Sequence, residues 1–235
     1  MKQLALAGLT VITVGAFGWY RGGDDAPAGI TGTVKFTGTP PANPKIDMSE
    51  EAACAGSATT DPVVTVSNGN LADVLVYVKS GLPPGAAAAA PTAPAVIDQH
   101  GCLYRPRTVA VMVKQPLEIR NSDPVLHNIK AVPKKNRGFN ISQPREGMKT
   151  TRTFTTAEVP IPLQCNVHGW MHANLAVLDH PYFAVTGPDG SFSIQGLPPG
   201  NYVLEAWHEK LGAQTMNVTV PATGNATANF TFSAK

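Results

Sequence analysis

The stretch Cys165-Asn-Val-His168-Gly-Trp-Met171-His172 places a thiol, an imidazole and a thioether within seven residues. Short apolar runs flank it, Ile161-Pro-Leu-Gln before it and Asn174-Leu-Ala-Val-Leu after it, and both are typical of strands. A further imidazole lies upstream at His127, where another predicted strand begins after an Asn-Ser-Asp-Pro turn. The pattern therefore predicts a strand, a tight loop and a strand, next to a neighbouring strand that carries His127.

These residue types together predict a copper site. Two imidazoles, one thiolate and a weak axial thioether form the ligand set of a blue-copper centre. Such a set suits both the soft Cu(I) ion and the harder Cu(II) ion, so little has to move when an electron is transferred. The candidate axial ligand is Met171, and His172 is the alternative.

The spacing C-x-x-H-x-x-M, preceded by N-x-x-x-x-x-H-N, resembles the cupredoxin family, with the short loop of its amicyanin and plastocyanin groups. The resemblance covers roughly residues 97–180 and implies a Greek-key sandwich that binds one copper ion. It implies equatorial ligation by His127, Cys165 and His168, with Met171 axial. It also implies two supporting residues, Asn128 beside the thiolate and Asn121 in the turn.

The composition favours an all-β fold. The chain of 235 residues has 22 glycines and 21 prolines, and Val, Thr and Ile recur in short alternating runs. Many short strands joined by turns are typical of sandwiches and barrels. We predict strands at 108–113, 117–120, 151–159 and 174–179, and a long polar loop at 134–150.

The tail from Phe183 onward is similar to the transthyretin-like or carboxypeptidase regulatory-like β-sandwich, through Asp189-Gly-Ser-Phe and Leu197-Pro-Pro-Gly-Asn-Tyr. Only half of that sandwich is present there. The opening stretch Gly29-Ile-Thr-Gly-Thr-Val and the run Val74-Leu-Val-Tyr-Val could supply the other half. The copper domain would then be inserted into the sandwich; the alternative is two domains in series.

The expected organisation has five parts. These are a signal peptide or membrane anchor (1–21), a linker (22–29), first strands belonging to either sandwich (30–95), the copper domain (96–180) and the second sandwich module (181–235).

The apolar run 4–20 carries no charge and is expected to be helical, as a signal peptide or an uncleaved anchor. Seventeen residues are near the lower limit for a membrane span. We therefore expect an extracytoplasmic protein, in the periplasm or at the cell surface, which segment 4–20 would attach to the membrane if it is not cleaved.

The three cysteines fit this compartment. Cys54 and Cys102 lie outside the metal motif and can pair in an oxidising environment. That pairing leaves Cys165 free to act as a metal thiolate.

Positive charge is concentrated between residues 105 and 152, where eleven basic residues accompany three acidic ones. This zone is either a solvated surface or a docking face for an acidic partner, with Lys134, Lys135 and Arg137 as candidates. Trp170 is either core or part of an apolar rim around an exposed edge of His168. Nucleic acid is not expected as a partner, because no aromatic residues alternate with the basic ones.

We predict a one-electron carrier that works by outer-sphere transfer through His168, with a partner such as a cytochrome or a membrane electron-transfer complex. A copper enzyme would need further copper sites, and the His-x-His pairs that usually mark them do not occur in the sequence. The alternatives are copper storage or delivery, and a structural role at the cell surface.

Overall fold

The computed structural model describes residues 28–86 and 88–234 of the chain. This described part consists of strands, turns and loops and contains no helix, which confirms the all-β class predicted for it. Among these residues there is no helix long and apolar enough to cross a membrane. The apolar segment 4–20, with its expected helix, lies outside the described residues.

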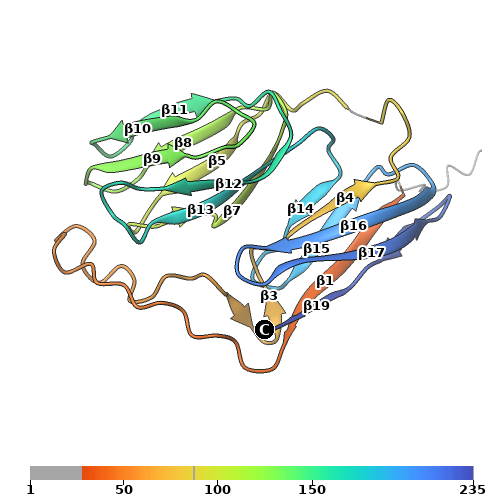
Figure 1. Ribbon diagram of the computed structural model, residues 1–235, viewed down its shortest axis with the longest axis horizontal. Helices are drawn as coiled ribbons and strands as arrows, with labels where there is room; N and C mark the ends of the chain where they lie inside the picture. The colour runs from red at the N-terminus through yellow and green to blue at the C-terminus, as the bar shows by residue number, and fades with distance from the viewer. Residues whose placement is uncertain (1–27, 87, 235) are drawn as a thin grey trace, which may run out of the picture.

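Two β-sandwiches lie side by side (Figure 1). The sandwich that carries the metal motif is here called the inserted sandwich. Its five-stranded sheet consists of β7 (Thr108–Met112), β9 (His127–Ala131), β10 (Phe139–Gln143), β12 (Glu158–Gln164) and β13 (His172–Leu178). The strand order in this sheet is β10-β9-β12-β13-β7. Its four-stranded sheet has the order β11-β8-β5-β6, made of β5 (Ala95–Gln99), β6 (Tyr104–Arg105), β8 (Leu117–Asn121) and β11 (Lys149–Arg152). One buried cluster joins the two sheets, including Ile97, Ile119, Ile129, Leu163 and Leu175.

The other sandwich, here called the host sandwich, combines strands from both ends of the described chain. Its six-stranded sheet contains β1 (Gly29–Thr37), β2 (Val66–Ser67), β3 (Asn70–Leu71), β15 (Ser191–Gln195), β18 (Asn225–Thr227) and β19 (Phe230–Ser233). Its four-stranded sheet has the order β14-β4-β16-β17, made of β4 (Leu75–Ser80), β14 (Phe183–Val185), β16 (Gly200–His208) and β17 (Gly212–Val220).

The connectivity is that of an insertion. Strand β4 and strand β14 are neighbours in one sheet, and the chain between them runs through the whole inserted sandwich. Strand β1 pairs antiparallel with β15 and parallel with β18 and β19, so strands from the two ends share one sheet.

Side-chain alternation explains which face of each strand is buried. In β8 the side chains of Leu117, Ile119 and Asn121 are buried, and those of Glu118 and Arg120 between them are partly exposed. Successive side chains of a strand point to opposite faces, so one face joins the core and the other meets solvent. Strand β16 follows the same rule with nine residues.

Two sequence predictions about the inserted sandwich are wrong. The segment 134–150, predicted as a loop, contains β10, which pairs with β9. The single strand predicted at 151–159 is instead the end of β11 and the start of β12, with a loop between them. The two strands belong to different sheets, so the chain crosses the sandwich where the sequence pattern is continuous.

The two sandwiches contact each other through an apolar cluster and an ion pair. The cluster has Leu75, Ala176 and Leu178 at its centre, with Trp207 packed against it. Close by, the buried guanidinium of Arg107 pairs with Asp61 and Glu209, whose Oε1 accepts from Arg107 Nε at 2.6 Å. Arg107 precedes β7, and Glu209 follows β16, so this pair joins the inserted sandwich to the host sandwich.

Candidate metal centre

Strand register brings the two halves of the candidate site together. Strands β9 and β12 are antiparallel neighbours, and Gln164 lies opposite Lys130. Continued by one to three residues, this register sets the start of the 165–172 loop beside Asn128 and His127. The contact is present, because the backbone N–H of Asn166 donates to Asn128 Oδ1 at 3.1 Å.

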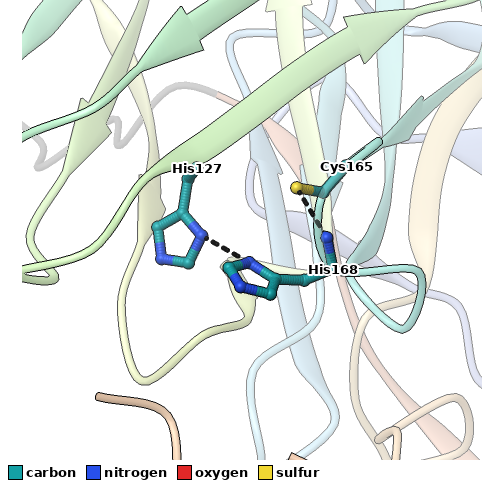
Figure 2. A group of neighbouring side chains, drawn as sticks. All are labelled: His127, Cys165 and His168. Carbon is teal, nitrogen blue, oxygen red and sulfur yellow. Dashed lines mark hydrogen bonds between the residues drawn. The ribbon is translucent and has the colours of Figure 1, made fainter. Parts of the chain in front are cut away.

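Three donor atoms converge at this end of the inserted sandwich. One ligand atom each of His127, Cys165 and His168 lies within 4.8 Å of the other two. The two imidazoles face each other with their Nδ1 atoms 3.0 Å apart (Figure 2). His127 is fully buried, and His168 and Cys165 are 4% and 5% exposed.

The surroundings favour a thiolate at Cys165. Burial by itself raises the pKa of this thiol, but hydrogen bonds from His127 and from backbone N–H groups outweigh it, so that the pKa is lowered. The N–H groups of His168 and Val167 donate to the sulfur at 3.3 Å and 3.4 Å, and that of Asn128 also contributes. Hydrogen bonds that stabilise an anion lower its pKa.

The two imidazoles have different environments. Burial lowers the pKa of His127, but the hydrogen bonds to Asp123 and Cys165, with the negative charge of both groups, outweigh burial and the pKa is raised. Burial and the charge of His127 both lower the pKa of His168. One histidine is therefore paired with a carboxylate and the other is not.

The donor set fits copper. Both Nδ1 atoms and the sulfur of Cys165, which favours the thiolate form, are directed at one buried point. Without a metal ion, two neutral imidazoles could only share a single proton between their Nδ1 atoms there. A soft thiolate with two imidazoles suits copper better than the hard ions that prefer oxygen ligands. His127, Cys165 and His168 are thus the residues that would hold the ion.

Met171 and His172 lie in different environments. Met171 is fully buried in the same cluster as Cys165, and its backbone closes the loop by donating to His168 O at 3.0 Å and accepting from Cys165 N at 3.1 Å. His172 is exposed and lines a surface groove with Arg107 and Glu209. The buried position makes Met171, and not His172, the residue available to the site from the core side.

The two asparagines fix the loops. Asn128 Nδ2 donates to Asn140 Oδ1 and to Ile141 O, which orients its Oδ1 toward the loop. Asn121 is buried, and its Nδ2 donates to Val125 O and Gln143 O at 2.9 and 2.8 Å. Asn121 therefore shapes the turn that leads into His127.

The sequence analysis missed Asp123. Its Oδ2 lies 2.8 Å from His127 Nε2, and it accepts backbone hydrogen bonds from Gly101 and Cys102, each at 2.8 Å. A carboxylate on the second ring nitrogen fixes the orientation and tautomer of a metal-binding histidine. The signal available in the sequence was an acid four residues before His127, which was taken only as a turn residue.

The expected disulfide between Cys54 and Cys102 is present, and Cys165 is free. Trp170 is partly buried, its ring centroid lies 5.1 Å from that of His168, and its Nε1 donates to Cys102 O at 3.0 Å. The expectation of an exposed His168 edge is wrong, because the segment that contains Cys54 covers it.

Lys134, Lys135 and Arg137 lie beyond the end of β9 opposite to His127. The Glu158 carboxylate accepts from the backbone N–H groups of Lys134 and Lys135 at the start of β12, while Cys165 follows the end of that strand. The proposed basic docking residues are therefore at the far end of the sheet from the candidate site.

Comparisons with known proteins give one family match and several similar solved structures. The model of the carboxypeptidase regulatory-like domain family matches residues 171–233. A comparison with curated proteins finds no match. Similar solved structures include a Cu(I) amicyanin variant, with 22% identity, a TM-score of 0.32 and coverage of 43% of this chain and 97% of that one.

Two further solved structures are similar to this chain. A purple cupredoxin from Nitrosopumilus maritimus has 20% identity and a TM-score of 0.31, covering 35% of this chain and 98% of that one. A copper-containing nitrite reductase from Thermus scotoductus SA-01 has 19% identity and a TM-score of 0.32, covering 42% of this chain and 25% of that one. The case for a metal in this chain rests on its own donor atoms.

Proposed function

We propose that this protein binds one copper ion through His127, Cys165 and His168, with Met171 as a weak axial ligand, and carries single electrons between extracytoplasmic redox partners. The convergence of two Nδ1 atoms and a thiolate at one buried point carries this proposal. Bound copper would supply a one-electron Cu(I)/Cu(II) couple.

The protein's contribution is a rigid set of donors. Backbone N–H groups hold the sulfur of Cys165, and Asp123 holds the ring of His127. The backbone N–H of Cys165 donates to Met171 O and that of Met171 donates to His168 O, which closes the loop. Donors fixed by their own hydrogen bonds change position little between oxidation states, which lowers the reorganisation that electron transfer requires.

The disulfide supports an oxidising, extracytoplasmic compartment. Segment 4–20 is the proposed attachment to a membrane. The proposed partner is a redox protein such as a cytochrome or a membrane electron-transfer complex. Because the basic residues Lys134, Lys135 and Arg137 are remote from the site, they would attract an acidic partner over a distance and would not form its docking contact.

Copper storage is a second candidate, favoured by the burial of His168, which is 4% exposed. A covered site keeps its ion but exchanges electrons slowly with a partner. The host sandwich contributes none of the proposed copper ligands, so its presence is compatible with both functions.

The test is a visible spectrum of the full chain with added Cu(II), followed by voltammetry. We expect an intense thiolate-to-copper band that Cys165→Ser removes and that His172→Ala, at an exposed neighbouring position, retains. A reversible one-electron wave supports the carrier, whereas tight colourless Cu(I) binding without a wave supports storage. Absence of Cys165-dependent binding of either Cu(II) or Cu(I) would refute both.

A further inference from the structure

Residues 45–60 form a cap over one end of the inserted sandwich. They belong to no sheet, and an isolated bridge between Lys45 and Thr60 closes them into a loop. From this loop Met48 and Cys54 are buried against Cys102 and Leu103, with Trp170 packed at the edge. The disulfide is the covalent connection between this cap and the sandwich beneath it.

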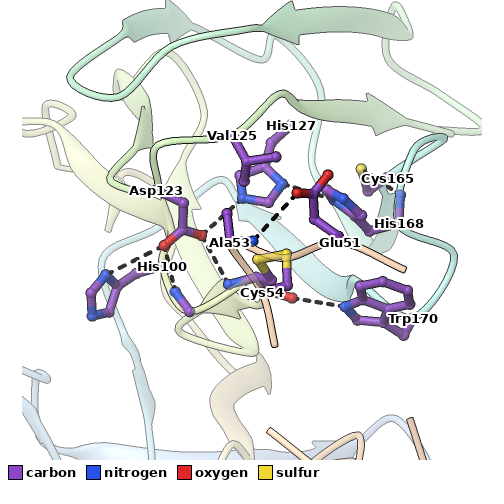
Figure 3. Close-up of a disulfide and its surroundings, with 12 residues drawn as sticks. Glu51, Ala53, Cys54, His100, Asp123, Val125, His127, Cys165, His168 and Trp170 are labelled. Carbon is purple, nitrogen blue, oxygen red and sulfur yellow. Dashed lines mark hydrogen bonds and ion pairs between the residues drawn. A yellow bond between two sulfur atoms is a disulfide. The ribbon is translucent and has the colours of Figure 1, made fainter. Parts of the chain in front are cut away.

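The cap lies over the candidate metal centre. Figure 3 shows Glu51 of the cap beside the imidazoles of His127 and His168, with Ala53 and Cys54 next to it. The Glu51 carboxylate is close enough to act electrostatically on His168. The cap explains why the ring of His168, on a loop at the end of the sandwich, has almost no contact with solvent.

The disulfide also holds the groups that fix both histidines. The backbone N–H of Cys102 donates to Asp123 Oδ2, the same oxygen that contacts His127 Nε2. The backbone C=O of Cys102 accepts from the indole of Trp170, whose ring packs against His168.

Cys102 is itself next to the site. Its sulfur, an oxygen of Asp123 and a ring nitrogen of His127 all lie within 4.8 Å of one another. Because this sulfur belongs to the disulfide, it is not available as a ligand. A bond so close to His127 constrains the donor geometry directly.

We infer that the Cys54–Cys102 disulfide is a positioning element of the metal centre: it keeps the cap closed over His168 and holds Asp123 and Trp170 against the two histidines. The role of this centre as a copper site rests on the proposed function. Closure of the cap is a property of the protein without metal and is tested without metal.

The first experiment uses the metal-free full chain and diethyl pyrocarbonate, which modifies accessible imidazoles, with each histidine followed by tandem mass spectrometry. In the Cys54→Ser/Cys102→Ser variant we expect the modification rate of His168 to rise by about tenfold or more, because opening no longer works against a covalent tether. Added N-acetylhistidine serves as the reference for reagent activity in every sample.

Two controls separate opening of the cap from unfolding. Ala55→Ser adds a hydroxyl group at an exposed position of the cap and keeps the disulfide, so His168 should stay protected. His208, 1% exposed in the host sandwich, must stay protected in every variant. Met48→Ala weakens cap packing with the disulfide intact and should give a smaller increase than the double variant.

The second experiment measures loss of copper from the loaded protein to a Cu(I) chelator, where the double variant should lose copper about tenfold faster or more. Equal His168 modification in wild type and double variant would overturn the inference, even if the blue band forms. Faster modification in a protein that never forms the band would keep the cap and overturn the proposed function.

Discussion

Replacing Arg107 by methionine should destabilise the protein, because it leaves two carboxylates without their cation. Its guanidinium side chain is 7% exposed, and those of Asp61 and Glu209 are 10% and 19% exposed. Burial lowers the pKa of Arg107, but its hydrogen bonds to the two carboxylates and their negative charges outweigh burial, so the pKa is raised and the group stays charged.

Removing one partner of a buried ion pair costs about 3–5 kcal/mol. Glu209 retains the hydrogen bond from Asn174 Nδ2 at 2.9 Å and keeps some solvent, so we expect the lower end, about 3 kcal/mol of unfolding free energy. Because Asp61, Arg107 and Glu209 belong to different parts of the chain, the loss should appear as weakened contact between the two sandwiches.

The assay is urea unfolding with the disulfide intact, followed by tryptophan fluorescence, to which Trp207 in the contact between the sandwiches contributes. The matched control is Arg105→Met, an exposed arginine two residues away, which should change stability by less than about 0.5 kcal/mol. The triple variant Arg107→Met, Asp61→Asn, Glu209→Gln should recover most of the loss. Equal effects of the two single arginine substitutions would refute the reasoning.

Three further predictions concern the site and the host sandwich. Asp123→Asn should weaken copper binding about 10- to 100-fold and raise the reduction potential of the copper, because the carboxylate no longer supports His127. Competitive titration measures the affinity and voltammetry the potential, and an unchanged affinity would argue against this role of Asp123. Met171→Leu should keep copper and raise its reduction potential, whereas His172→Ala should change neither copper binding nor the potential. If voltammetry finds a changed potential in His172→Ala and not in Met171→Leu, His172 is the axial ligand. Burial, with the charge of Arg107, lowers the pKa of His208 from 6.5 to about 4, so the unfolded chain binds a proton at this residue more tightly than the folded chain does. Acidification from pH 6.5 to 4 should therefore remove up to about 3 kcal/mol of unfolding free energy. Urea titrations across this pH range should find a smaller loss in His208→Asn.

The sequence could predict that His127, Cys165 and His168 lie together, because the signal for this is local. Cys165, His168 and Met171 follow one strand within seven residues, and His127 begins a strand whose apolar pattern is clear. The pairing of Cys54 with Cys102 followed from an odd cysteine count and one thiol reserved for metal.

The rest depended on contacts distant in sequence. Strand β10 was hidden because Phe139 and Ile141 alternate within a charged stretch, and only pairing with β9 makes it a strand. The cap has no strand pattern, and its position follows from a disulfide that spans 48 residues. The burial of His168 could therefore not be derived from the loop that contains it.

Strand β1 has a consequence for how this protein is made. The backbone N–H of Thr33 donates to Asn229 Oδ1, 196 residues further along the chain. The first strand of the host sandwich can therefore complete its contacts only after almost the whole polypeptide has been synthesised. During synthesis the backbone groups of β1 that pair with β18 and β19 stay unpaired, and a truncation before β18 would leave that edge free to join other molecules. Chaperone dependence and aggregation of nascent chains should accordingly track the C-terminal strands and not the 165–172 loop.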